Sequence, residues 1–138
     1  MFVKDIMVKK VVSIESDKTV LDACEKYKEL GVGCLVVTKN GIITGIVTER
    51  DMIERVIIDQ KNPKKTKVEE IMSKDIKTVH ASARIEQAAE IMKKYKIKKL
   101  PVILNNEVAG IITVTDLANI MPNFSEELDM RRESFKFV

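Results

Sequence analysis

Hydrophobic positions along the chain follow two spacings, one typical of helices and one typical of short strands. Four apolar residues recur at i, i+3, i+4 and i+7, the spacing of one helix face: Val20, Ala23, Cys24 and Tyr27. Apolar runs follow at residues 34–38 and 42–47, separated by Asn40-Gly41, a dipeptide typical of a tight hairpin turn. A short strand before this helix and a second helix from about Thr48 complete a predicted β-α-β-β-α order.

The whole pattern occurs twice. Residues 3–55 align with residues 68–120 at a constant shift of 65 positions, without a gap, and 14 of the 53 pairs are identical. The hairpin turn recurs at Asn105-Asn106, and the apolar helix face recurs as Ile85, Ala88, Ala89 and Met92. We infer duplication of one structural unit, and the predicted fold class is α/β (α+β) with two tandem repeats packed as a pseudo-twofold pair.

The repeat divides the chain into four segments. Residues 1–58 form the first repeat, residues 59–67 a linker, residues 68–120 the second repeat, and residues 121–138 a tail. The linker is polar, basic and interrupted by Pro63, which is typical of a solvated connection. In the tail, Ser125-Glu-Glu-Leu resembles a helix start. Docking of this helical tail is expected from four apolar side chains: Phe124, Leu128, Phe135 and Phe137.

Composition narrows the class of protein. With 138 residues, 45% of them hydrophobic and 33% charged, the chain is expected to be globular. Its net charge of +3 comes from 24 basic and 21 acidic residues, which is not the excess typical of a dedicated nucleic-acid-binding protein. No apolar stretch reaches the roughly 18 residues that span a bilayer, and no signal peptide is evident, so we expect a cytoplasmic location without membrane contact. Cys24 and Cys34 lack metal-ligand spacing and are expected to be buried.

Candidate chemistry lies where each repeat ends. The pattern Gly-x-x-Thr-x-x-Asp occurs at Gly45, Thr48 and Asp51, and again at Gly110, Thr113 and Asp116. A carboxylate at a helix start can accept hydrogen bonds from both hydroxyls of a ribose, and threonine can donate to ribose or phosphate. Glycine lets the strand backbone be approached closely. Thr-x-x-Asp is equally a capping box, in which the two side chains satisfy backbone N–H groups at the helix start.

The larger pattern resembles a known family, the CBS-domain pair, over residues 3–120. The resemblance rests on the two endings, the duplicated unit, the openings Asp5-Ile-Met and Glu70-Ile-Met, and the strand start Lys98-Lys-Leu-Pro-Val. It implies a stand-alone regulatory module that is not an enzyme. Two clefts between the repeats would bind AMP, ADP, ATP or S-adenosylmethionine. The resemblance also implies a homodimer and a separate, regulated partner protein.

By the same resemblance, each cleft takes residues from both repeats. The cleft around Asp116 is expected to contain Thr113, Thr115, Lys10, Val12, Val32 and Gly33, with Lys98 or Lys99. The cleft around Asp51 is expected to contain Thr48, Arg50, Asp75, Lys77, Ile97 and Lys98. The apolar members suit an adenine ring, and ordinary core packing is the alternative. Since Asp75 would repel phosphate where the first repeat has Lys10, the Asp116 cleft is the better candidate for a phosphorylated ligand.

Two other functions remain as alternatives. Lysines of the linker and of residues 93–99 could bind nucleic acid, although lysine-rich segments are ordinarily solvated surfaces and the balanced charge argues against this partner. An enzyme would need a nucleophile, a base and an orienting group together, and the sequence offers no such set. His80, the one histidine, has no neighbouring partner for a metal site or a dyad and is expected on the surface.

Overall fold

In the computed structural model, residues 1–124 are described, and they form two compact units whose limits differ from those of the sequence repeats. The first-repeat unit contains residues 12–76. The second-repeat unit combines residues 1–11 with the chain from Lys77 onward. Within the described residues, none of the helices is both long enough and apolar enough to span a bilayer.

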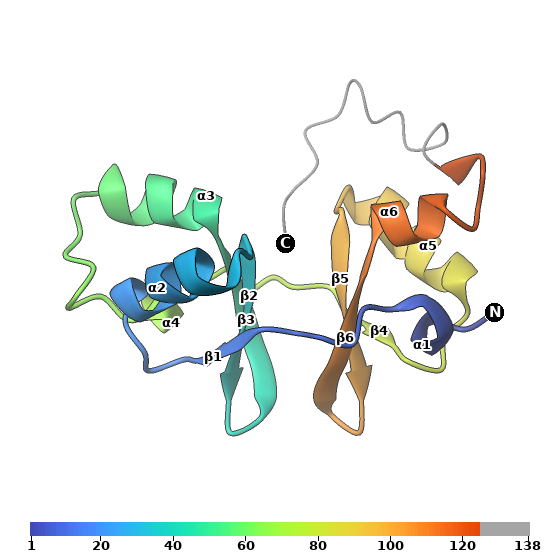
Figure 1. The fold of residues 1–138 in the computed structure, drawn as a ribbon, viewed down its shortest axis with the longest axis horizontal. Coiled ribbons are helices and arrows are strands. Elements are labelled where there is room, and N and C mark those ends of the chain that lie inside the picture. The colour runs from blue at the N-terminus through green and yellow to red at the C-terminus, as the bar shows by residue number, and fades with distance from the viewer. Residues whose placement is uncertain (125–138) are drawn as a thin grey trace. The chain divides into compact units, whose positions relative to one another are not determined.

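The first-repeat unit is a three-stranded sheet with helices on one side (Figure 1). Its strands are β1 (Ser13–Glu15), β2 (Cys34–Lys39) and β3 (Ile42–Thr48), in that order across the sheet. Strand β1 is parallel to β2, and β2 is antiparallel to β3. Its helices are α2 (Val20–Leu30), α3 (Glu49–Met52), the π-helical continuation η1 (Ile53–Ile57) and α4 (Val68–Ile71).

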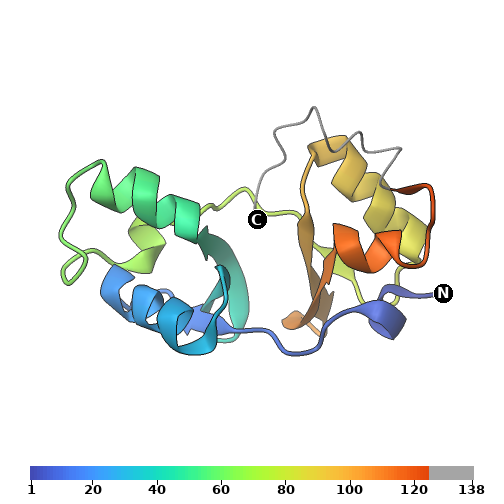
Figure 2. The same cartoon turned by 45° about the horizontal axis from the view of Figure 1, so that its top comes forward.

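The second-repeat unit has the same architecture. Its sheet order is β4 (Val79–His80), β5 (Lys99–Leu104) and β6 (Glu107–Thr113), and its helices are α5 (Ile85–Tyr95), α6 (Val114–Ala118) and α1 (Val3–Ile6). Figure 2 shows α5 and α6 on the same side of this sheet. The strand register is that of the first unit shifted by 65, including an irregularity after Val37 that recurs after Val102. The predicted β-α-β-β-α order and fold class are therefore confirmed.

The local signals in the sequence explain these elements. Both hairpin turns have two consecutive residues with positive φ, at Asn40-Gly41 (54° and 81°) and Asn105-Asn106 (53° and 64°). This conformation matches the twist of the flanking strands, and asparagine and glycine adopt it at low cost. In the first helix of each repeat, the residues of the predicted apolar face point toward the core, and Ala23 and Ala88 are fully buried.

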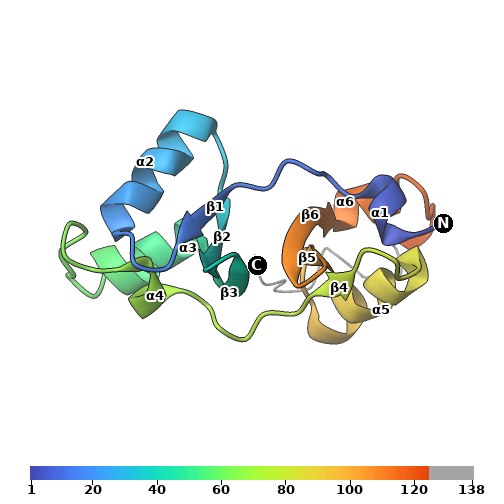
Figure 3. The ribbon, with the colours of Figure 1, turned by 90° about the horizontal axis from the view of Figure 1, so that it is seen from below.

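The opening segment of each repeat packs in the unit of the other repeat. In the second-repeat unit, Val8 N–H donates to the carbonyl oxygen of Ile111 at 2.8 Å, and Ile111 N–H donates back at 2.9 Å. In the first-repeat unit, Ser73 and Ile46 form the equivalent pair, at 2.9 and 3.1 Å. Figure 3 shows α1 beside the helices and strands of the second-repeat unit. The two opening segments are therefore exchanged reciprocally.

Each core includes side chains from its exchanged segment. Val3 is buried in the core of the second-repeat unit, and Val68 and Ile71 are buried in that of the first. The predicted solvated linker is in part packed, since Thr66 is buried and its carbonyl oxygen accepts the N–H of Val20 at 2.8 Å.

At the other end, Phe124 is buried in the core of the second-repeat unit. The remaining tail residues for which docking was expected, Leu128, Phe135 and Phe137, lie outside the described residues, as does the helix start at Ser125.

Candidate functional site

The Thr-x-x-Asp pair of the first repeat lies at the junction of β3 and α3. Thr48 is the residue that caps α3, and its N–H donates to Oδ2 of Asp51 at 2.8 Å. Asp51 N–H donates in return to Oγ1 of Thr48 at 3.4 Å, and the Thr48 hydroxyl lies 3.2 Å from Oδ2. The sequence reasoning therefore identified two side chains that are in direct contact.

The second repeat repeats this geometry. Thr113 N–H donates to Oδ2 of Asp116 at 2.8 Å, and Asp116 N–H donates to Oγ1 of Thr113 at 3.2 Å. Both pairs are capping boxes, so the structural alternative considered for this motif is realised at each site. A nucleotide role for the aspartates would have to coexist with capping.

A third Thr-x-x-Asp pair, which the sequence reasoning missed, caps α2. Thr19 N–H donates to Oδ2 of Asp22 at 3.0 Å, and Asp22 N–H donates to Oγ1 of Thr19 at 3.2 Å. Its spacing was visible in the sequence, but α2 begins after a tight turn and not at the end of a hairpin strand. This pair caps a helix at a position that is not the end of a hairpin strand, and it supplies an internal control for the other two.

The glycines of the two signatures accommodate the exchanged segments. A Cβ atom at Gly45 would overlap Sδ of Met72 and lie 2.8 Å from the carbonyl oxygen of Ser73. The close approach expected at these glycines is therefore made by the chain itself. It explains why Met7 and Met72 occupy equivalent positions in the two opening segments.

Asp51 lies in a more enclosed and more highly charged setting than its counterpart. Asp51 as a whole residue is only 9% exposed, and its Oδ1 lies 3.7 Å from Nε of Arg55. Burial raises the pKa of Asp51, against the opposing effects of the Thr48 hydrogen bonds and the Arg55 charge. The Arg55 guanidinium also donates through Nη1 to the carbonyl oxygen of Ile71 at 2.9 Å, which ties α4 to this helix.

Arg50, the residue expected to contact phosphate, forms an ion pair on the surface. Its Nε lies 2.8 Å from Oε1 of Glu54, and this hydrogen bond raises the pKa of Arg50. The second repeat has none of these charges at the equivalent positions. Glu49, Arg50, Glu54 and Arg55 are replaced there by Val114, Thr115, Asn119 and Ile120.

The other predicted residues divide between the two units. In the first-repeat unit, the carbonyl oxygen of Gly33 accepts the N–H of Glu49 at 3.2 Å, which places Gly33 beside the start of α3. Val12 and Val32 are half-buried against the core of this unit. Thr48, Arg50 and Asp51 belong to the same unit, and Asp75 is exposed near its end.

The second-repeat unit holds the remainder. The carbonyl oxygen of Lys98 accepts the N–H of Val114 at 2.9 Å, and Lys99 pairs with Thr113 across β5 and β6. These two lysines therefore lie beside the start of α6, near Asp116. Lys10 and Thr115 are exposed, whereas Ile97 is buried in the core, the alternative considered for it. Lys77 Nζ lies 4.5 Å from the centroid of the Tyr95 ring.

Tyr27 is a polar group near Asp51 that the sequence reasoning assigned only to the apolar helix face. Its hydroxyl oxygen is buried and makes no hydrogen bond with any described residue. Burial raises the pKa of Tyr27 well above its ordinary value, and the nearby Cys34 and Asp51 act in the same direction. The equivalent residue in the second repeat is Met92, so this buried phenol belongs to the first-repeat unit alone.

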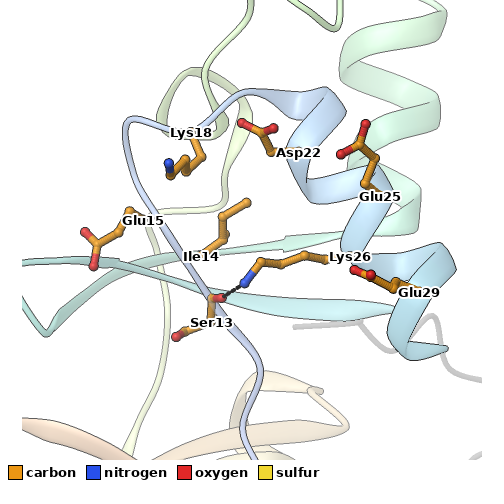
Figure 4. Close-up of a pocket in the computed structure, with 8 residues that line it drawn as sticks. All are labelled: Ser13, Ile14, Glu15, Lys18, Asp22, Glu25, Lys26 and Glu29. Atoms are coloured by element: carbon orange, nitrogen blue, oxygen red, sulfur yellow. Dashed lines mark hydrogen bonds between the residues drawn. The ribbon is translucent and has the colours of Figure 1, made fainter.

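A cavity of about 390 Å³ opens between β1 and α2 (Figure 4). Lys26 crosses it, and its Nζ donates to the carbonyl oxygen of Ser13 at 2.9 Å. Apart from Ser13 and Ile14, the lining side chains are all charged: Glu15, Lys18, Asp22, Glu25, Lys26 and Glu29. None of the predicted ligand residues lines this cavity, and so much charge does not suit an adenine ring. In the described part of the chain, no group of three or more His, Cys, Asp or Glu side chains is placed to hold a metal ion.

The geometry and the duplication agree with comparisons to known proteins. The chain belongs to the CBS domain family, which it matches over residues 3–58 and 68–123. It is 32% identical over 124 residues to the CBS domain-containing protein YhcV of Bacillus subtilis (strain 168), covering 89% of this chain and 88% of that protein. The resemblance to a tandem CBS-domain pair is thereby confirmed.

Two solved structures are similar as well. One is the conserved CBS domain protein TA0289 of unknown function from Thermoplasma acidophilum, with a TM-score of 0.79, 26% identity, and coverage of 100% of this chain and 80% of that chain. The other is a putative signal-transduction protein with CBS domains from Burkholderia ambifaria MC40-6, with a TM-score of 0.70, 28% identity, and coverage of 83% and 85%. The chain is therefore a CBS-domain module of the regulatory and signal-transduction type.

Proposed function

We propose that this module senses an adenine nucleotide or a related adenosine compound and does not catalyse a reaction. The observation that carries the proposal is the pair of Thr–Asp contacts at Thr48–Asp51 and Thr113–Asp116, which occupy equivalent strand ends in a CBS-domain pair. Each aspartate caps its helix through Oδ2. A carboxylate has several acceptor positions, so a ribose diol can bind while the capping bond is kept.

The proposal includes the composition of the two clefts and the location of the protein. Residues from both repeats would line each cleft: Lys10, Val12, Val32, Gly33, Thr113, Thr115, Asp116, Lys98 and Lys99 for one, and Thr48, Arg50, Asp51, Lys77, Ile97 and Lys98 for the other. Ile97 would take part only as a core residue that shapes the wall, since it is buried. The proposed location is the cytoplasm, in which the thiols of Cys24 and Cys34 would remain reduced.

The two clefts would differ in the ligands that they accept. Around Asp51, the arginines already face carboxylates, since Arg50 pairs with Glu54 and Arg55 lies near Asp51. A phosphate there would compete with these contacts and would be repelled by Glu49. Around Asp116, the equivalent positions are uncharged, and Lys98 and Lys99 belong to the same unit. We therefore assign the phosphorylated ligand to the Asp116 cleft, and a ligand with less negative charge to the Asp51 cleft.

A homodimer and a regulated partner protein complete the proposal. Support for the dimer comes from η1 and the residue that follows it, where Ile53, Ile57 and Ile58 are 53%, 69% and 66% exposed. Three exposed isoleucines within six residues, here called the isoleucine face, are unusual for a water-exposed surface. The neighbouring Arg50–Glu54 pair gives this face both signs of charge, which suits contact with a second copy of itself. Ligand binding would change the relative packing of the units and so the contact with the partner.

Thermal unfolding with AMP, ADP, ATP and S-adenosylmethionine tests the ligand proposal. A ligand at a hundred times its dissociation constant stabilises by about 2.7 kcal/mol. We expect Asp116→Ala to abolish the shift with ATP, and Asp51→Ala to leave that shift largely intact. Asp22→Ala is the matched control, because it removes a capping box of the same geometry without touching either cleft. If no adenosine compound stabilises the unmodified protein, or if Asp22→Ala weakens binding as much as Asp116→Ala, the proposal is wrong.

Light scattering coupled to size-exclusion chromatography tests the dimer. We expect Ile57→Asp to convert the dimer to monomers, because it places a charge in the middle of the isoleucine face. Ile42→Asp is the control, since Ile42 is 55% exposed in the hairpin, away from that face. A monomeric unmodified protein, or a dimer that survives Ile57→Asp, would contradict this arrangement.

A further inference from the structure

A lysine-rich surface surrounds Tyr95, the last residue of α5. Tyr95 is 39% exposed, and the Nζ atoms of Lys77 and Lys94 lie 4.5 and 5.3 Å from the centroid of its ring. Lys93 Nζ lies 5.7 Å from the ring centroid of Phe124. We call this set the tyrosine–lysine surface: Tyr95, Lys77, Lys93, Lys94, Lys96 and Lys98. It combines an exposed aromatic ring with two ammonium groups next to that ring, those of Lys77 and Lys94, and with three further lysines on the same stretch of chain.

The fold itself does not require these lysines. The first repeat makes the same turn after α2 with Gly31 in the left-handed conformation, at φ 65°. The second repeat places Lys96 there, at φ 53°, a conformation that is strained for a residue with a Cβ atom. Between residues 28 and 34 the first repeat has one lysine, whereas the equivalent residues 93–99 contain five. Lysine at a helix C-terminus is favourable, but this effect alone would act equally on both repeats.

Charge is distributed unequally between the two units. In the second-repeat unit, the described residues include ten Lys or Arg and five Asp or Glu. In the first-repeat unit there are eleven basic and twelve acidic residues. The small net charge of the chain therefore conceals one cationic unit and one nearly neutral unit. The balanced total, which argued against a nucleic-acid partner, does not describe the second-repeat unit.

We propose that the tyrosine–lysine surface binds single-stranded nucleic acid. An unpaired base would stack on the ring of Tyr95 by displacing one of the ammonium groups over it, and the lysines would contact backbone phosphates, which is how sequence-tolerant single-strand sites work. An acidic protein would satisfy the lysines but would gain little from the exposed ring. Lys77 and Lys98 are shared with the proposed nucleotide clefts, whereas Lys93, Lys94, Tyr95 and Lys96 are not, so this inference goes beyond the sensor function.

Fluorescence anisotropy with a fluorescein-labelled oligouridine of about 12 nucleotides tests the proposal. Tyr95→Leu introduces the residue that the first repeat has, Leu30, and we expect it to weaken binding about tenfold through loss of stacking. The double variant Lys94→Ala with Lys96→Gly keeps the left-handed turn. We expect it to lower the slope of log affinity against log salt by about 1.4. The matched control is Lys64→Ala with Lys65→Ala, which removes two exposed lysines of the linker and should change neither quantity.

Each alternative outcome would overturn the proposal. The proposal is wrong if the unmodified protein does not bind the oligonucleotide. It is also wrong if Lys64→Ala with Lys65→Ala weakens binding as much as Lys94→Ala with Lys96→Gly, because that result would indicate nonspecific attraction to positive charge. If polyglutamate displaces the oligonucleotide and Tyr95→Leu has no effect, the surface binds acidic chains in general. The double variant Asp51→Ala with Asp116→Ala separates this inference from the sensor function, because it should bind the oligonucleotide as the unmodified protein does.

Discussion

Met7 lies so close to Gly110 that position 110 has no room for a side chain. A Cβ atom there would be 2.7 Å from Sδ of Met7 and 2.8 Å from the carbonyl oxygen of Val8. The contact joins residues that are more than a hundred positions apart in the sequence. It lies beside the β-bridge between Val8 of the exchanged segment and Ile111 of β6. The signature glycine thus serves the assembly of the unit.

Gly110→Ala should therefore destabilise the protein without involving any ligand. We expect the free energy of unfolding to fall by about 1 to 3 kcal/mol, because the backbone oxygen of Val8 cannot move away cheaply. Chemical denaturation measures the change. At Gly33, an added Cβ would lie 3.5 Å from Glu49, an ordinary contact, so Gly33→Ala is the control. Equal stabilities for the two variants would refute the close approach.

The reciprocal exchange predicts that two equivalent substitutions act on opposite units. Val3 and Val68 occupy the same position of the repeat and are both fully buried. Val3→Ala should cost about 1 to 3 kcal/mol and lower the hydrogen-exchange protection of β5 and β6. Val68→Ala should lower the protection of β2 and β3. Loss of protection in the strands of the same repeat as the substitution would contradict the exchange.

Asp51 should give the stability a dependence on pH with a definite sign. Because burial raises its folded-state pKa above the ordinary 3.8, the folded state binds more protons than the unfolded state. The free energy of unfolding should then decrease as the pH rises from 3.8 through the raised value. Asp51→Asn keeps an acceptor for Thr48 N–H and removes this contribution, so its stability relative to the unmodified protein should improve as the pH rises.

Asp22 provides the control for this sign. The backbone N–H of Thr19 lowers the pKa of Asp22, so its contribution is present above the ordinary value and lost as the pH falls through the lowered one. Asp22→Asn should accordingly lose stability relative to the unmodified protein as the pH rises. Denaturation curves between about pH 2 and pH 7 measure both differences, since the Asp22 contribution changes below the ordinary pKa of 3.8 and the Asp51 contribution above it. If the stability of Asp51→Asn relative to the unmodified protein falls as the pH rises, as expected for Asp22→Asn, then burial does not dominate the pKa of Asp51.

Tyr27→Phe should stabilise the protein in the absence of ligand. The buried hydroxyl has no hydrogen-bond partner among the described residues, so its removal relieves an uncompensated loss of hydration. We expect a gain of about 1 kcal/mol in the free energy of unfolding. Tyr95→Phe, at the exposed tyrosine, should change the stability by less than about 0.5 kcal/mol. A loss of stability in Tyr27→Phe would mean that the hydroxyl is bonded in solution.

Much of the fold could be predicted because its signals are local. The turns at Asn40 and Asn105 need residues that tolerate positive φ, and the helices at Thr48 and Thr113 need caps; both requirements are visible within a few residues. Because the two repeats align at a constant shift of 65 positions, each local signal occurs twice in the sequence. Agreement between two copies is strong support, since one error would have to occur twice.

The exchange of opening segments could not be predicted, because it depends on contacts between distant residues. The sequence placed Met7 in the first repeat, and only the position of Gly110 reveals where it packs. The candidate site was partly predictable for the same reason. Thr48 and Asp51 were found as a contact, but the pairing of Arg50 with Glu54 depends on side-chain geometry that the residue types left open. Tyr27 was predicted to lie on an apolar helix face, which is correct for its ring, but that pattern gives no information about its hydroxyl.

The exchanged openings have a consequence for the origin of this chain. A chain with one copy of the repeat has an opening segment, and it has a strand edge that such a segment covers, but in this fold the two come from different copies. Two single-repeat chains could each cover the strand edge of the other with their opening segments, which is domain swapping in a symmetric dimer. Joining their genes would have made the partner permanent, so that an association between molecules became a connection within one.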